Sequence, residues 1–146
     1  MSVKKERVAI HLQTMIDDGA EKEYHSIEEM GTFLRRGEID VLTFYERTKE
    51  EGEVRHLISI YPDKVNINRT GEVRINQQFL LRQKTESKLQ LPQGNIHMEI
   101  VTKKIDYQPM ERHKKGILII NYEATLNGQM KRNHTLELTY NKEEMK

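Results

Sequence analysis

The chain lacks cysteine and tryptophan altogether, and it has only three prolines and three phenylalanines among its 146 residues. Without cysteine it has no thiol nucleophile, thiolate metal ligand or disulfide. Long apolar runs are missing too, because the longest, residues 117–120, is far short of the roughly 20 residues that span a bilayer. No uninterrupted apolar stretch near the N-terminus fits a signal peptide. We therefore expect one soluble domain over residues 1–146, located in the cytoplasm and not bound to a membrane.

Motifs of well-known catalytic and nucleotide-binding sites are also absent. The chain has no Gly-x-x-x-x-Gly-Lys-Ser/Thr, Gly-x-Gly-x-x-Gly, His-Glu-x-x-His or Gly-x-Ser-x-Gly. Its six histidines stand singly, so we expect no metal site and no cofactor. An acid–base pair of Tyr122 and Glu123 conflicts with strand geometry, which turns adjacent residues to opposite faces. We assign no catalytic residue. Whether the protein is an enzyme stays open, and we favour a protein without catalytic activity.

Apolar and polar residues alternate with a period of two along most of the chain, which predicts β-strands. The clearest runs are residues 118–126 and 134–140, and Asn127-Gly128 between them is typical of a type I′ hairpin turn. A phase slip before Ile105 indicates a β-bulge. Similar runs and turn signals recur along the chain, and they predict an all-β fold, a single antiparallel meander β-barrel of about 8–10 strands.

The N-terminal part of the chain allows two interpretations. Residues 8–16 fit a helix as well as a strand, and Ser26-Ile27-Glu28-Glu29 matches the capping box that begins many helices. A helix within residues 20–36 therefore stands as an alternative to a strand there.

The order of several turn and strand signatures resembles a known family. These signatures are Asp17-Asp18-Gly19, Phe44-Tyr45-Glu46, Asn68-Arg69-Thr70-Gly71 and Leu91-Pro92-Gln93-Gly94, followed by Met98 and Thr102. From about Val8 to Tyr140 the chain resembles the YwiB-like family of uncharacterised bacterial proteins. The resemblance implies a lipocalin-like (calycin) β-barrel, with strands in both ambiguous segments, and it implies no substrate, cofactor or active residue.

Strand alternation places several polar residues on the predicted inner face: Thr43, Tyr45, His56, Arg69, Gln77, Tyr122, His134 and Tyr140. An apolar cavity with a few convergent polar groups is the usual form of a small-molecule site. We therefore predict a non-catalytic binder of a small apolar or amphipathic ligand, with an anionic group as one option. Its predicted contacts are Tyr45, His56, Arg69, Gln77, Tyr122 and His134. Arg69 either meets an anionic ligand or extends its side chain past the rim into solvent.

A second function comes from the distribution of charge. The formal net charge of +1 argues against a general polyanion binder, but a meander collects alternate turns at one end of a barrel, and one end is then mainly basic. An RNA- or protein-binding module that uses Arg112, Lys114 and Lys115 at this end is the alternative. Leu42 and Phe44, expected on the outer face, would form a patch for a weak homodimer; otherwise we expect a monomer.

Overall fold

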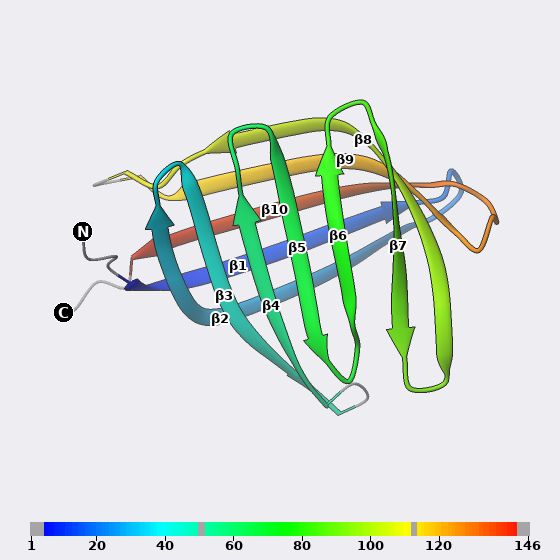
Figure 1. Ribbon diagram of the computed structural model, residues 1–146, viewed down its shortest axis with the longest axis horizontal. Helices are drawn as coiled ribbons and strands as arrows, with labels where there is room; N and C mark the ends of the chain where they lie inside the picture. Colours follow the sequence, from blue (N-terminus) through cyan, green and yellow to red (C-terminus); the bar gives the residue numbers. More distant parts are fainter. Residues whose placement is uncertain (1–4, 50–51, 112–113, 143–146) are drawn as a thin grey trace.

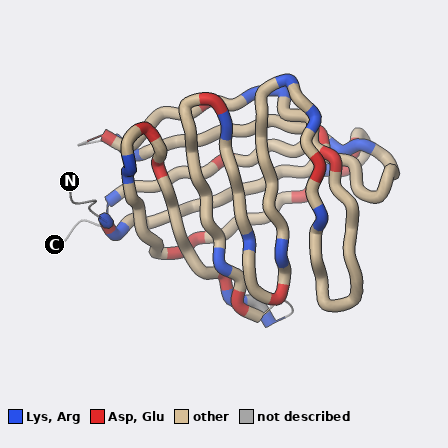
Figure 2. Tube along the Cα trace, in the orientation of Figure 1, with Lys and Arg blue, Asp and Glu red and all other residues tan. Residues whose placement is uncertain are grey.

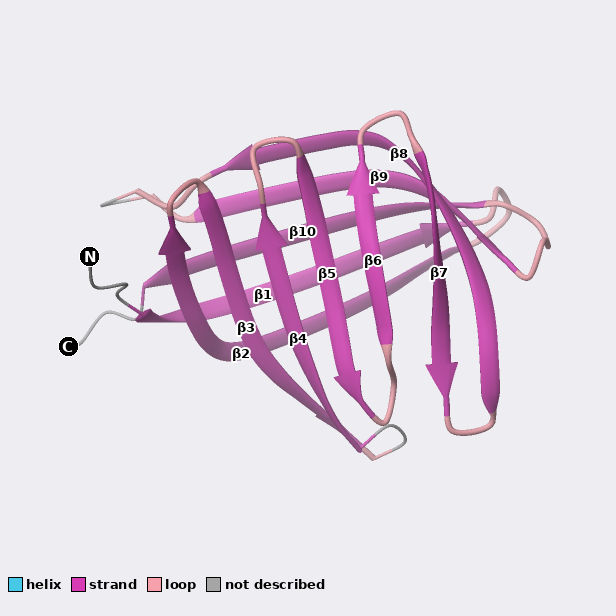
Figure 3. Cartoon of the chain, viewed as in Figure 1, coloured by secondary structure: helices cyan, strands magenta, loops and turns pink. Residues whose placement is uncertain are grey.

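The computed structural model describes residues 5–49, 52–111 and 114–142, and every regular element in these ranges is a β-strand (Figure 3). The described residues therefore contain no helix of the length and apolarity that a membrane span requires. The prediction of an all-β fold with about 8–10 strands is confirmed. The strands are β1 (Lys5–Asp17), β2 (Lys22–Arg36), β3 (Ile39–Thr48), β4 (Gly52–Ile60), β5 (Lys64–Gly71), β6 (Ile75–Leu80), β7 (Lys84–Leu91), β8 (Gly94–Gln108), β9 (Gly116–Leu126) and β10 (Arg132–Lys142).

All ten strands belong to one sheet in the order β6-β5-β4-β3-β2-β1-β10-β9-β8-β7. The sheet curls until its two edge strands, β6 and β7, lie side by side (Figure 1). These two edges share one isolated antiparallel bridge, between Arg74 and Gln90, instead of a ladder. The barrel is therefore nearly closed, and we call the junction of β6 and β7 the seam.

The two ends of the barrel differ in what they carry. Because strand direction alternates, the β2–β3, β4–β5, β6–β7 and β8–β9 turns belong to the same end of the strands as the start of β1 and the finish of β10, which we call the terminal end. The remaining turns lie at the opposite, distal end. This arrangement follows from a simple meander, because each strand reverses the direction of the one before it.

The middle of the barrel is filled by apolar side chains from both halves of the sheet. In β9 every second residue from Gly116 to Ala124 is buried, as a strand with one inner face requires. Leu42, Ile58 and Leu118 are completely buried and belong to one continuous core. Burial of each such side chain stabilises the fold by about 1.5–3 kcal/mol.

The ambiguous N-terminal segments are both strands. β2 pairs with β1 along its length, from Lys5 opposite Leu34 to Asp17 opposite Lys22. This long ladder outweighs the capping-box pattern at residues 26–29, so the helix alternative is wrong. The other local predictions are confirmed: the register of β8 against β9 shifts between Thr102 and Lys104, and Asn127 and Gly128 both have positive φ, 52° and 71°.

The predicted orientation of β3 is wrong. Leu42 and Phe44 are buried in the core, whereas the Tyr45 side chain is half exposed on the outer wall. The inner face of β3 begins and ends with a carboxylate, Asp40 and Glu46. These two charged residues led the alternation pattern to assign that face to solvent. The apolar patch expected there for a weak homodimer is therefore absent from the outer wall.

Gly116 is a position where the core has no space for a side chain. A Cβ atom at this residue would overlap the ring of Tyr140, which is fully buried. We expect Gly116→Ala to lower the free energy of unfolding by about 1–3 kcal/mol, because the ring has no space to move away. Urea unfolding measures the change. Gly37→Asn is the control, since nothing lies near an added Cβ at this turn glycine, whose positive φ asparagine accepts; equal stability of the two variants would contradict the packing argument.

Candidate functional site

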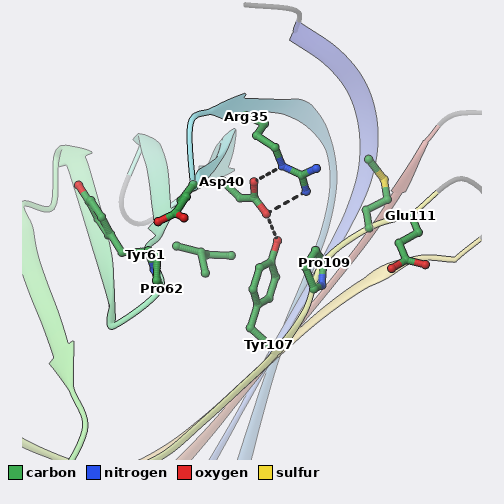
Figure 4. Close-up of a pocket in the computed structure, with 10 residues that line it drawn as sticks. Arg35, Asp40, Tyr61, Pro62, Tyr107, Pro109 and Glu111 are labelled. Carbon is green, nitrogen blue, oxygen red and sulfur yellow. Dashed lines mark hydrogen bonds and ion pairs between the residues drawn. The ribbon is translucent and has the colours of Figure 1, made fainter.

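A chain of hydrogen bonds centred on Asp40 closes the terminal end of the lumen (Figure 4). Asp40 lies on the inner face of β3 and is only 5% exposed. Arg35 Nε donates to Asp40 Oδ1 at 2.7 Å, and Arg35 Nη2 donates to Oδ2 at 3.3 Å. The Tyr107 hydroxyl, from β8, donates to the same Oδ2 at 2.6 Å. The buried carboxylate is therefore both neutralised and hydrogen-bonded, as burial of a charge requires.

The chain of contacts continues to β10. The hydroxyl oxygens of Tyr107 and Tyr140 lie 2.5 Å apart, and the Met110 amide donates to Tyr140 at 3.4 Å. Phe33 stacks on the Tyr140 ring at 5.4 Å. Burial raises the pKa of both tyrosines, so both stay neutral. We call Arg35, Asp40, Tyr107 and Tyr140 the terminal network; it links β3, β8 and β10, which are not neighbours in the sheet.

A hollow of about 350 Å³ lies outside the terminal network, between three turns of the terminal end. Apolar groups such as Ile60 and Met110 form part of its lining, and Glu38 and Glu111 add two carboxylates. Because Asp40 already neutralises Arg35, these carboxylates leave the hollow with negative charge. The negative charge of this hollow disfavours the binding of an anionic ligand.

The basic end predicted from turn order coincides with the terminal end. Arg112 lies outside the described residues, and Lys114 and Lys115 are exposed. Acidic residues are interspersed among the basic ones at these turns (Figure 2), and Glu111 exchanges both backbone hydrogen bonds with Lys114 at 3.1 Å. Contact of this end with a polyanion therefore stays a prediction.

The other predicted contacts gather in the distal half of the lumen, with the exception of Tyr45. His56 on β4 lies opposite Arg69 on β5, and Tyr122 on β9 lies opposite His134 on β10. The rings of Tyr122 and His134 stack at 4.8 Å. Gln77, on β6, reaches across to Met98 on β8, with its Nε2 at 3.3 Å from the sulfur. We call His56, Arg69, Gln77, Tyr122 and His134 the luminal polar cluster.

His56 has a carboxylate partner that the sequence did not reveal. Its Nε2 lies 3.0 Å from Glu46 Oε1, and its ring stacks on Phe44 at 4.5 Å. Burial lowers the pKa of His56, Glu46 opposes this shift, and the charge of Arg69 adds to it. Glu46 therefore orients the imidazole within an apolar wall.

Three polar atoms on β7, β8 and β10 are buried without a hydrogen-bond partner among the described residues. They are Ser87 Oγ, Thr102 Oγ1 and His134 Nδ1. Thr102 is completely buried and lies opposite Tyr122, whose hydroxyl makes no hydrogen bond within the described ranges. Each unsatisfied buried polar atom costs about 1–3 kcal/mol. Buried polar atoms in native proteins are normally paired with protein groups, ordered water or bound molecules, so these three atoms are candidates for such contacts.

Comparison with known proteins decides the family. The model of the family described as "Domain of unknown function (DUF1934)" matches residues 10–138. The chain belongs to this family. A curated relative, the uncharacterized beta-barrel protein YwiB of Bacillus subtilis (strain 168), is 23% identical over 133 residues, which cover 91% of this chain and 92% of the relative. The crystal structure of YwiB from Bacillus subtilis superimposes with a TM-score of 0.85 at 22% identity, covering 97% of this chain and 96% of that one. The resemblance to the YwiB-like family and the barrel fold are thereby confirmed.

The distal end of this DUF1934 barrel has an apolar lining that is only partly covered. Leu89 and Leu91 on β7, and Ile96 on β8, point to the inner side of their hairpin but are half-buried. They lie outside the closely packed core, which Met98 only borders. A ligand at the luminal polar cluster would therefore lie beside the apolar side chains of Leu89, Leu91 and Ile96.

A group of three exposed or half-exposed side chains on β7 and β8 has ligand atoms within 4.8 Å of one another: Glu86, His97 and Glu99. Lys84 Nζ already binds Glu99 at 3.1 Å on this outer surface. Exposed acidic groups of this kind are common without an ion, so we assign no metal site here.

Protonation of His134 gives a test of the cluster's burial. Burial, with the charge of Arg132 in second place and opposed by Glu23, lowers the pKa of His134 from 6.5 to about 4. The folded protein thus keeps this ring neutral where the unfolded chain binds a proton, and its contribution to stability is present above pH 6.5 and lost as the pH falls towards 4. We expect His134→Gln to flatten the pH dependence of urea unfolding in this window. His25→Gln, which removes an exposed histidine, is the control; an unchanged slope in His134→Gln would contradict the burial of this ring.

Proposed function

We propose that the protein is a non-catalytic binder of a small amphipathic molecule, held in the distal half of the barrel lumen in the manner of a lipocalin. The polar part of the ligand faces Tyr122, Thr102 and His134. Its apolar part lies against the half-buried Leu89 and Ile96 of the β7–β8 hairpin. Glu46 and His56 form the opposite polar wall.

The observation that carries the proposal is the group of unsatisfied polar atoms. At the terminal end the buried polar groups Asp40, Tyr107 and Tyr140 all have hydrogen-bond partners. On β7, β8 and β10, Ser87 Oγ, Thr102 Oγ1 and His134 Nδ1 have none among the described residues. Buried polar groups without hydrogen bonds lower the stability of the folded protein. A bound molecule that forms hydrogen bonds with Ser87, Thr102 and His134 would remove this cost.

The filled middle of the barrel restricts where the ligand enters. The terminal network and the core beneath it separate the terminal end from the luminal polar cluster. The distal end and the seam are the remaining routes, and both border the half-buried β7–β8 hairpin.

The alternative, an RNA- or protein-binding module at the terminal end, gains no specific support from the described residues. Glu38, Glu111 and the neutralised Arg35 line that surface, and carboxylates repel a polyanion. Lys114 and Lys115 stay candidate contacts for this role.

Replacement of Thr102 by valine separates ligand binding from simple structure. Thr102→Val keeps the shape of the side chain and removes the unpaired hydroxyl, so we expect it to raise the stability of the empty protein by about 1 kcal/mol while weakening ligand binding. The measurements are urea unfolding and native mass spectrometry of the full chain from a bacterial cytoplasm, before and after incubation with dodecanoate. Wild type should show a non-covalent mass excess that Thr102→Val reduces.

The control is Thr125→Val, which removes a hydroxyl from the outer face of β9 and should leave binding unchanged. A wild-type protein that shows no mass excess from the cytoplasm or with dodecanoate would argue for a permanently filled barrel. Equal binding by wild type and Thr102→Val would remove the ligand from the luminal polar cluster.

A further inference from the structure

The outer wall carries a second hollow of about 350 Å³ at the distal part of the seam. Its lining comes from β5, β6 and β7 and the turn before β6. It is distinct from the terminal-end hollow in both position and chemistry, because its lining contains three cationic residues, Arg69, Arg74 and Lys88, and no carboxylate.

The strand register explains why these side chains share one surface. Asn68 pairs with Asn76 across β5 and β6, and Arg74 pairs with Gln90 across the seam. Continuing the antiparallel bridge by two residues sets Asn76 beside Lys88. Alternation then directs all five side chains to the outer face.

The hollow exists because β6 and β7 do not form a continuous ladder of backbone hydrogen bonds along the seam. Arg74 and Gln90 exchange both backbone hydrogen bonds, at 3.0 and 2.8 Å. The next pair along, Asn76 and Lys88, forms no such bridge, and the strands separate there. Towards the terminal end a side-chain contact, from Thr85 Oγ1 to the Gln78 carbonyl at 2.6 Å, again crosses the seam. An opening between two fixed contacts is a preformed site rather than a loose edge.

The charges of two of the cations are available to a ligand. Arg74 and Lys88 are exposed and form no ion pair with any residue in the described ranges. The amide groups of Asn68, Asn76 and Gln90 line the same hollow and supply neutral N–H donors. An arginine fork, a lysine ammonium and several amide donors around one opening form a set that matches the oxygens of a phosphate group.

We propose that this hollow binds the phosphate group of a small phosphorylated molecule. A volume of about 350 Å³ is in the range of small-molecule pockets and leaves space for an organic part beside the phosphate. Arg69 of the luminal polar cluster also lines the hollow, but the proposed phosphate contacts, Arg74 and Lys88, lie on the outer face, and the site does not depend on the amphipathic ligand proposed above. Single-stranded nucleic acid is a worse fit, because such sites combine positive charge with aromatic stacking surfaces and no aromatic residue lines the hollow.

Titration of the full-length protein with glucose 6-phosphate tests the proposal, with glucose as the uncharged comparison. In two-dimensional ¹H–¹⁵N spectra we expect shifts of the Asn76, Lys88 and Gln90 amides that saturate with glucose 6-phosphate and are absent with glucose. The double variant Arg74→Gln, Lys88→Gln should lose about tenfold or more in affinity, because each replaced contact is a charge-assisted hydrogen bond. Thermal unfolding without ligand checks that this variant is folded.

The matched control, Lys104→Gln with Lys115→Gln, removes two exposed positive charges away from the seam and should keep wild-type affinity at constant ionic strength. Thr102→Val should also keep wild-type affinity for glucose 6-phosphate. The result of this titration therefore does not depend on whether the luminal ligand exists. Absence of seam shifts up to 20 mM (about the weakest affinity of interest), or equal loss in the control, would overturn the proposal. A second result would also overturn it: an octauridylate that binds more tightly than glucose 6-phosphate and loses affinity in Tyr45→Ala. The outer wall from the exposed Tyr45 to the seam would then be a nucleic-acid interface.

Discussion

The pairing of β1 with both β2 and β10 is the constraint on which the barrel depends. β1 joins the first meander, β2 to β6, to the second meander, β7 to β10, through two long antiparallel ladders. Once these ladders form, the curl of the sheet brings β6 and β7 together as the remaining edges. This closure is tight at the terminal end, where the terminal network joins β3 to β8 and β10, and it is incomplete at the seam.

The terminal network and the luminal polar cluster treat buried polar groups in different ways. At the terminal end Asp40 receives two donors from Arg35 and one from Tyr107, so the cost of burying its charge is offset locally. On either side of Tyr122, Thr102 and His134 keep buried atoms that nothing in the described chain satisfies. A satisfied network makes the structure rigid, whereas an unsatisfied one is stable only with help from outside the chain. The first is therefore a structural closure, and the second is the better candidate for a binding site.

Local pattern was enough to predict most of the fold, because a meander needs little information beyond alternation and turns. Asn127-Gly128 and the phase slip before Ile105 each had one interpretation, and both were right. The orientation of β3 was not predictable in the same way, since Asp40 and Glu46 lie inside only because Arg35, Tyr107 and His56 approach from other strands. The same limit applies to the site: alternation identified His56, Gln77, Tyr122 and His134 as inward residues. Alternation also sets Thr102 in phase with Met98 and Ile100, whereas the inward position of Glu46 depends on a contact with His56 that no local pattern contains.

The open seam leaves two strand edges without a complete ladder. Unpaired strand edges invite association with other chains, and proteins usually pair, cover or charge them. Here the two edges already face each other, and a few more backbone hydrogen bonds would complete the barrel. Arg74 and Lys88 stand at the point where pairing stops, and their like charges oppose closer approach of the strands. A phosphate bound between them would reverse that repulsion and draw the edges together, so that ligand binding and barrel closure would stabilise each other. Since the same strands carry Gln77, Ser87 and Leu89 on their inner faces, closure of the seam would also change access to the luminal polar cluster. The incomplete pairing thus places the outer hollow and the lumen on the two sides of one junction between β6 and β7.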